Sequence, residues 1–157
     1  LEGPGGFIRS FPQLATPEQA VAHVNFWMDQ GATSFKAYNL ITRETLGAGI
    51  EAAHARGAKV TGHLCSITYQ EAADLGIDNL EHGFFAATDW VQDKEPDQCP
   101  RGQDLRYLDL DLDAPEFTDV VDHLIESGVA LTSTLTVVER RASGRPAPPY
   151  GVSDGSR

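Results

Sequence analysis

The chain has 157 residues, of which 41% are hydrophobic and 22% are charged, and its formal net charge at pH 7 is −11. A chain of this length is normally one globular domain with a sizeable buried core. The acidic balance argues against a nucleic-acid-binding surface, because phosphates require basic side chains. No run of about 18 apolar residues is present to provide a membrane span. Composition leaves the compartment and the oligomeric state open.

The first regular elements predicted from the sequence are a helix and a strand. Thr16 is an N-cap, Pro17 suits the first helical position, and Gln19 completes a capping box. Gly31 ends the helix, and residues 33–38 are rich in aromatic and β-branched side chains, which predicts a strand. The apolar face of this helix is predicted to consist of Ala20, Val21, Val24, Trp27 and Met28.

The same unit recurs three times further along the chain. Helices that end at Gly57, Gly76 and Gly128 are followed by predicted strands at 58–64, 77–82 and 129–138. Four helix–glycine–strand units in series predict an α/β protein with a parallel sheet. The predicted apolar face of the last helix consists of Phe117, Val120, Val121, Leu124 and Ile125.

Two segments depart from this repeat. Residues 84–113 have no clear periodicity and carry most of the acid, which predicts an acidic insertion loop within a domain that spans residues 1–138. Residues 139–157 are rich in Arg, Gly, Ser and Pro, which predicts a flexible or disordered tail. Cys65 and Cys99 show no C-x-x-C spacing, and we expect both to be free thiols.

Two architectures are compatible with the repeat. An open doubly wound sheet binds its ligand at a switch point, usually on a glycine-rich phosphate loop, and the sequence contains neither G-x-G-x-x-G nor a Walker motif. A (β/α)8 TIM barrel instead gathers polar side chains from the C-terminal ends of many strands and needs about 250 residues. We therefore expect a partial barrel of about four consecutive βα units.

Three chemically reactive side chains favour the barrel. Lys36 lies five residues after Gly31, and His63 and His82 each lie six residues after the glycine that precedes their strand. Similar offsets predict that the three side chains lie at about the same height on successive strands. Neutral histidine is the commonest metal ligand, so these residues could bind a metal. Alternatively, the histidines are structural hydrogen-bonding groups and Lys36 extends from a sheet edge to solvent.

The runs Phe35-Lys36-Ala37-Tyr38, Val60-Thr61-Gly62-His63-Leu64 and Asn79-Leu80-Glu81-His82-Gly83 resemble the amidohydrolase superfamily. The resemblance is to the branch that contains imidazolonepropionase-like and Xaa-Pro or Xaa-Arg dipeptidase-like metal hydrolases. It covers residues 16–85 closely and 115–138 loosely, and it implies that the four units are strands 4 to 7 of the barrel.

This resemblance implies a role for each matching residue. Lys36 would be carboxylated and would bridge two divalent ions, expected to be zinc, while His63 and His82 would bind the second ion. A metal-activated hydroxide would hydrolyse a C–N bond in an amide, a cyclic amide or a small peptide, with Tyr38 contacting the substrate. Strand alternation makes Glu81 point away from His82 and take a structural hydrogen bond or ion pair, whereas Thr134 would line the pocket without being a ligand.

Part of the family's ligand set is missing from the chain. The paired His-x-His of the first strand does not occur in residues 1–30, and Asp154 is the only aspartate placed to follow strand 7, in a setting that does not suit a strand end. We therefore expect a fragment that is inactive alone. Two alternatives stay open: a non-catalytic α/β binding module with structural histidines, and a mononuclear deaminase or imidazolonase, which would lack the bridging lysine.

Overall fold

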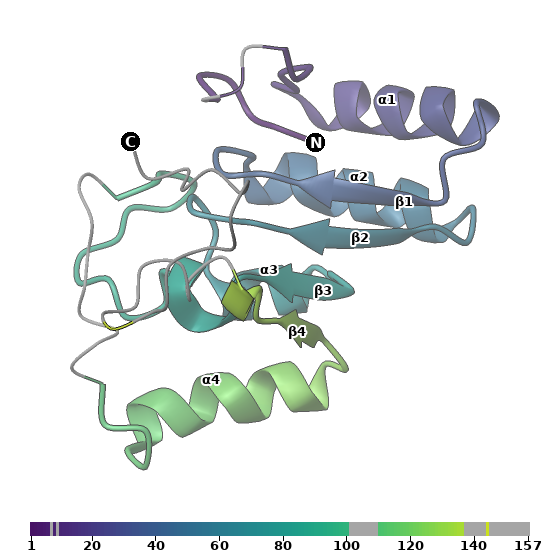
Figure 1. The fold of residues 1–157 in the computed structure, drawn as a ribbon. Coiled ribbons are helices and arrows are strands. Elements are labelled where there is room, and N and C mark those ends of the chain that lie inside the picture. Colours follow the sequence, from purple (N-terminus) through teal and green to yellow (C-terminus); the bar gives the residue numbers. More distant parts are fainter. Residues whose placement is uncertain (7, 9, 101–109, 137–143, 145–157) are drawn as a thin grey trace.

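In the part of the chain that the structure describes, helices α1 to α4 alternate with strands β1 to β4 (Figure 1). A computed structural model describes residues 1–6, 8, 10–100, 110–136 and 144. The predicted tail apart from Gly144, and the end of the last predicted strand at 137–138, lie outside the described residues. The elements are α1 (Pro17–Asp29), β1 (Ser34–Ala37), α2 (Arg43–His54), β2 (Lys59–Gly62), α3 (Tyr69–Asp74), β3 (Asn79–Glu81), a 3₁₀ turn (Gly83–Ala86), α4 (Pro115–Glu126) and β4 (Ala130–Thr132).

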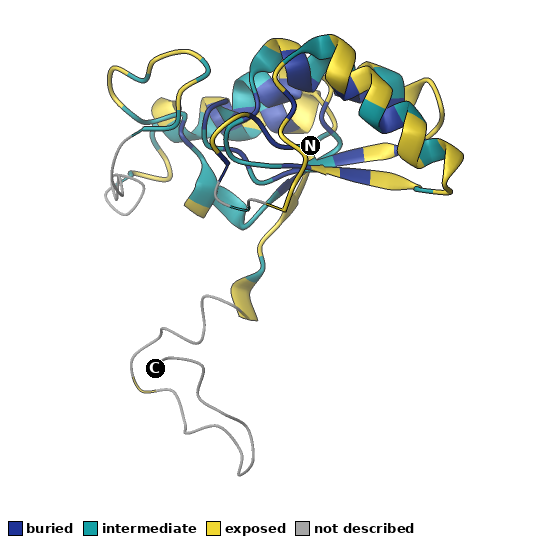
Figure 2. Cartoon of the chain, turned by 90° about the horizontal axis from the view of Figure 1, so that it is seen from above, coloured by how far each residue is buried: buried dark blue, intermediate teal, exposed yellow. Residues whose placement is uncertain are grey.

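The strands form one parallel sheet in the order β1-β2-β3-β4, which confirms the predicted α/β class. Lys36 is in register with Thr61, and Thr61 is in register with Asn79. The helices lie on one side of the sheet (Figure 2). The other side, which we call the helix-free face, is turned toward the viewer in Figure 1. Among the described helices, none has the length and apolar character that crossing a membrane requires.

The starts of α1, α2 and α3 are capped by threonines, whereas α4 begins at Pro115 without a side-chain cap. The side chains of Thr16, Thr42 and Thr68 each accept a hydrogen bond from the backbone N–H three residues later. Thr68 forms a full capping box with Glu71. The predicted box at Thr16 is incomplete, because the Gln19 side chain accepts from Ala15 N–H, one residue before the cap.

The core lies between the helices and one face of the sheet. Side chains alternate along β1 and β2, so that Phe35, Ala37, Val60 and Gly62 are buried while their neighbours face the other way. From α2, three apolar residues pack against this face and are almost fully buried: Leu46, Ile50 and Ala53. Polar side chains are thereby left on the helix-free face.

The apolar faces predicted for α1 and α4 are partly wrong. In α1, Ala20 and Val24 are buried, but Val21 and Trp27 are 36% and 45% exposed. In α4, Val120 and Leu124 are buried but Ile125 is 69% exposed. In each helix, the two buried residues are four positions apart and form a narrow buried stripe. Apolar residues beside that stripe therefore stay at the surface.

Residues 84–100, which we call the anchored segment, are held at the ends of α2 and α3. Asp89 accepts hydrogen bonds from Tyr69 N–H and Gln70 N–H, the first two backbone donors of α3. Asp97 accepts from the backbone N–H and the guanidinium of Arg43, the first residue of α2. Carboxylates are favourable at helix N-termini, where backbone donors lack intrahelical partners. Two of the acidic residues in the predicted insertion are therefore helix-capping groups.

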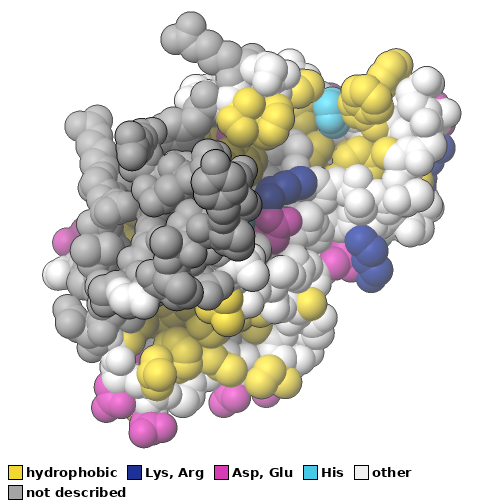
Figure 3. Space-filling view, in the orientation of Figure 1, with side chains coloured by type: hydrophobic (Ala, Val, Ile, Leu, Met, Phe, Trp, Pro, Cys, Tyr) yellow, Lys and Arg dark blue, Asp and Glu magenta, His cyan; other side chains and the backbone are white. Residues whose placement is uncertain are grey.

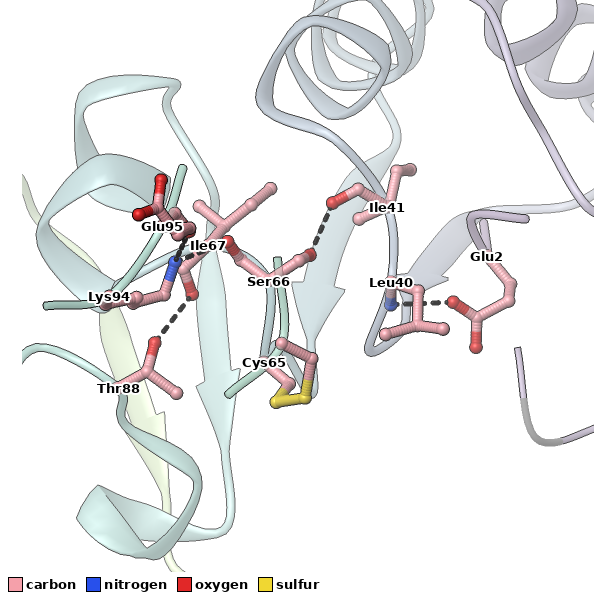
Figure 4. The surroundings of a disulfide bond; sticks show 10 residues. Glu2, Leu40, Ile41, Cys65, Ser66, Ile67, Thr88, Lys94 and Glu95 are labelled. Carbon is pink, nitrogen blue, oxygen red and sulfur yellow. Dashed lines mark hydrogen bonds between the residues drawn. A yellow bond between two sulfur atoms is a disulfide. The ribbon is translucent and has the colours of Figure 1, made fainter. Parts of the chain in front are cut away.

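A disulfide joins the anchored segment to the loop after β2 (Figure 4). Cys65 and Cys99 form this bond, with their Cα atoms 4.9 Å apart, so the prediction of free thiols is wrong. Next to it, Lys94 donates a hydrogen bond to the Ser66 carbonyl at 2.6 Å. The two cysteines are 34 positions apart in the sequence, and only the fold brings them together.

Candidate functional site

Lys36 lies on the helix-free face and forms an ion pair with Glu81. The Lys36 side chain is 45% exposed and that of Glu81 is 17% exposed. The other carboxylate oxygen of Glu81 accepts a hydrogen bond from the Thr61 hydroxyl at 3.0 Å. Lys36, Thr61 and Glu81 thus connect three neighbouring strands. Figure 3 shows basic and acidic side chains next to one another on this face. Two ion pairs at the sheet are Lys36–Glu81 and Lys59–Asp78.

His63 follows β2 directly, and its backbone N–H donates to the Ala37 carbonyl at 3.0 Å. The predicted equal height of Lys36 and His63 is wrong, because Lys36 is in register with Thr61, two residues before His63. Residues two apart on a strand share a face, so both side chains lie on the helix-free face. The long lysine side chain spans part of the difference in height.

His82 ends β3 with a left-handed backbone, φ +73°. This conformation interrupts strand alternation and brings His82 Nε2 to 3.7 Å from Glu81 Oε2. The prediction that Glu81 points away from His82 is therefore wrong, while its predicted ion pair is present, with Lys36 as the partner. On the other side of the ring, His82 Nδ1 lies 2.7 Å from the Thr134 hydroxyl.

Aromatic contacts complete the group. The rings of His63 and His82 have centroids 4.4 Å apart, and those of Tyr38 and His63 are 5.0 Å apart. Lys36 Nζ lies 6.0 Å from the centre of the Tyr38 ring. The residues expected to bind the metals or the substrate therefore belong to one cluster at the C-terminal ends of β1, β2 and β3. We call it the Lys36 cluster: Lys36, Tyr38, His63, Glu81 and His82.

The surroundings of the cluster determine the charges of two members. Burial, followed by the neighbouring His82 and Lys36, lowers the pKa of His63 to about 4. His63 is thus neutral at pH 7, which is the form that binds metals. Burial alone would raise the pKa of Glu81, but hydrogen bonds from Lys36 and Thr61 outweigh it and lower that pKa. Glu81 is therefore an anion at neutral pH.

A chain of hydrogen bonds runs from the cluster across the helix-free face. The Thr132 hydroxyl donates to Asn79 Oδ1 at 2.8 Å, and Asn79 Nδ2 donates to the Thr61 hydroxyl at 2.7 Å. Thr61 in turn donates to Glu81. Sequence reasoning missed this network, although polar residues at alternate positions of β1, β2 and β3 signalled a polar face.

The donor set fits part of a metal site. Lys36 and His82 lie beside the Glu81 carboxylate, and the neutral ring of His63 packs against His82. Protein zinc sites use three or four ligands. Among the residues that the structure describes, no group of three or more His, Cys, Asp or Glu side chains is arranged to hold a metal ion. Metal binding at these residues would therefore require additional ligands, and Asp154 lies outside the described residues.

Comparison with protein-family models and with curated protein sequences finds no match for this chain.

Proposed function

We propose that this chain is a segment, about strands 4 to 7, of the (β/α)8 barrel of a metal-dependent amidohydrolase that hydrolyses a C–N bond in an amide, a cyclic amide or a small peptide. One observation carries the proposal: Lys36, His63 and His82, from three consecutive strands, belong to one cluster at the C-terminal strand ends. That end of the strands is where barrel enzymes hold their catalytic groups.

The sheet topology supports a barrel over a doubly wound sheet. Its strands follow the chain in the order β1-β2-β3-β4, without the reversal that creates a switch point. The helices share one side of the sheet (Figure 2), as they do on the outside of a barrel. The helix-free face would then be the barrel interior, and the anchored segment would lie beside the barrel mouth.

Each residue of the cluster has a role in this proposal. His63 and His82 offer imidazole nitrogens to a divalent cation, and Lys36, once carboxylated, offers two oxygens that can bridge two cations. Bound ions of this kind supply an activated water and stabilise negative charge on a carbonyl oxygen. Tyr38 stands at the edge of His63 and offers a hydroxyl and an aromatic ring to a small-molecule or peptide-like substrate.

Lys36 must change partners for this chemistry. Its amine is paired with Glu81, whereas carboxylation needs an uncharged amine that has left the carboxylate. The same ion pair favours the alternative of a non-catalytic α/β module, because it satisfies Lys36 without a metal. His82 approaches that pair, and His63 packs against His82, which favours the metal proposal. A lysine at this position argues against the mononuclear deaminase or imidazolonase.

Metal content of the intact protein tests the proposal. We expect about two divalent ions per chain, and we expect Lys36→Ala to remove most of the metal and of the hydrolytic turnover. Lys59→Ala is the matched control, because Lys59 also lies on the helix-free face and pairs with Asp78, at 2.6 Å, but lies outside the cluster. An intact protein without divalent metal, or a Lys36→Ala variant with native metal content and turnover, would contradict the proposal.

A further inference from the structure

Two residues with left-handed backbones face each other at the ends of β3 and β4. His82 has φ +73° and Thr134 has φ +49°, and they are among four non-glycine residues with positive φ in the described part of the chain. Such a conformation is rare for a β-branched residue such as threonine and costs of the order of 1–3 kcal/mol. Strained residues of this kind concentrate at functional sites, where the surrounding structure enforces them.

The two strained residues contact each other through their side chains. Thr134 Oγ1 lies 2.7 Å from His82 Nδ1, well within hydrogen-bonding distance. The opposite ring nitrogen, Nε2, faces the Lys36 cluster, 3.7 Å from Glu81 Oε2. Thr134 therefore contacts the nitrogen that points away from the cluster. It contacts His82 without being a member of the cluster.

The hydrogen bond at Nδ1 determines what Nε2 can do. A neutral imidazole carries one proton, so a proton on Nδ1 leaves a free lone pair on Nε2. Metal-binding histidines typically donate from their other nitrogen to an oxygen acceptor, which fixes both the tautomer and the ring orientation. A threonine hydroxyl has two acceptor lone pairs and suits this role.

We propose that Thr134 is a positioning residue for His82: its hydroxyl accepts a hydrogen bond from Nδ1–H and thereby presents the Nε2 lone pair to the Lys36 cluster. This inference rests on the proposed function, because orienting His82 matters only if His82 is a metal ligand. The hydrogen bond and the tautomer, however, are properties of the metal-free protein. They can be measured whether or not a metal binds.

Nitrogen NMR of the metal-free intact protein, labelled with ¹⁵N-histidine and held at one pH, tests the tautomer. In the native protein and in Thr134→Ser, which keeps the hydroxyl, we expect the His82 proton on Nδ1. Thr134→Val keeps the shape and the β-branch but removes the acceptor, and we expect the proton to move to Nε2. Thr134→Ala gives the same comparison should the valine variant fail to fold. Thr132→Val, which breaks the hydrogen bond to Asn79 instead, should leave His82 unchanged.

Zinc titration of the same variants measures the consequence for binding. Losing a hydrogen-bond partner of a metal ligand lowers metal affinity by about 10- to 100-fold, so we expect this loss in Thr134→Val and near-native affinity in Thr134→Ser and Thr132→Val. A His82 proton on Nε2 in the native protein, or an unchanged tautomer in Thr134→Val and Thr134→Ala, overturns the role of Thr134. Absence of zinc binding in every variant, with the tautomer changing as expected, overturns the proposed function and leaves the positioning hydrogen bond established.

Discussion

At the scale of single residues, His63 is the member of the cluster with the most altered acid–base behaviour. Its ring lies between those of Tyr38 and His82, and burial combined with the charges of His82 and Lys36 lowers its pKa to about 4. In an unfolded chain, histidine has a pKa of about 6.5. Folding therefore keeps His63 neutral over a pH range in which the unfolded chain takes up a proton.

This difference predicts how the metal-free protein responds to acid. Because the folded pKa of His63 is depressed, its contribution to stability is fully present above pH 6.5 and is lost as the pH falls from 6.5 toward 4. NMR titration of the histidine Cε1–H signal should give a midpoint near pH 4 for His63. His82→Gln should raise that midpoint, because it removes the second-largest cause of the shift. A native midpoint near 6.5 would contradict the prediction.

At the scale of elements, the repeat was predictable because its signals are local. Threonine caps mark the starts of α1, α2 and α3, a glycine follows each helix, and a strand begins two or three residues after that glycine. The ends of the strands were not predictable in this way. β3 stops at Glu81 because His82 adopts a left-handed backbone, and no alternation pattern encodes that change of direction. The position of Glu81 and the grouping of the cluster depend on it.

Long-range pairings set a second limit on prediction from sequence. The partnership of Cys65 with Cys99 and the capping of α3 by Asp89 join residues about 20 to 34 positions apart. The anchored segment lacks periodicity because its conformation is held by these contacts with α2 and α3. It contains no regular repeat of its own. Composition identified the segment as an insertion but could not assign partners to its carboxylates.

The capping role of Asp89 gives a prediction at this scale. Asp89→Ala leaves the first two backbone N–H groups of α3 without their acceptor, so we expect a loss of about 1–2 kcal/mol in the free energy of unfolding. Urea denaturation followed by circular dichroism measures it. Glu95→Ala, which removes an exposed acid from the same segment, should change stability little. Equal effects of the two substitutions would show that Asp89 is not a cap.

At the scale of the whole molecule, the described sheet has an open side. β4 is the last strand in the sheet order, and all three of its residues are exposed. The helix-free face carries Lys36, Thr61, Asn79 and Glu81, polar groups that pair with one another across the strands. A strand edge with unpaired backbone groups is a template for association with another chain.

We therefore expect the 157-residue chain on its own to self-associate and to have low stability. Ala130→Lys places a charge on the exposed edge strand and should reduce association, which static light scattering against concentration measures. Leu112→Lys adds the same charge at a residue that is 61% exposed but lies outside the strands, and should reduce it less. A native chain that stays monomeric at high concentration and melts cooperatively would contradict this expectation.

The disulfide makes a covalent link between two parts of the chain that are far apart in the sequence. The bond between Cys65 and Cys99 closes a ring of chain that contains α3, β3 and His82, while His63 lies just outside the ring. A single proteolytic cut anywhere between the two cysteines opens the ring but leaves both products joined by the bond. His82 would thus remain tethered to the strand that carries His63 after such a cut, and only reduction would release the two fragments.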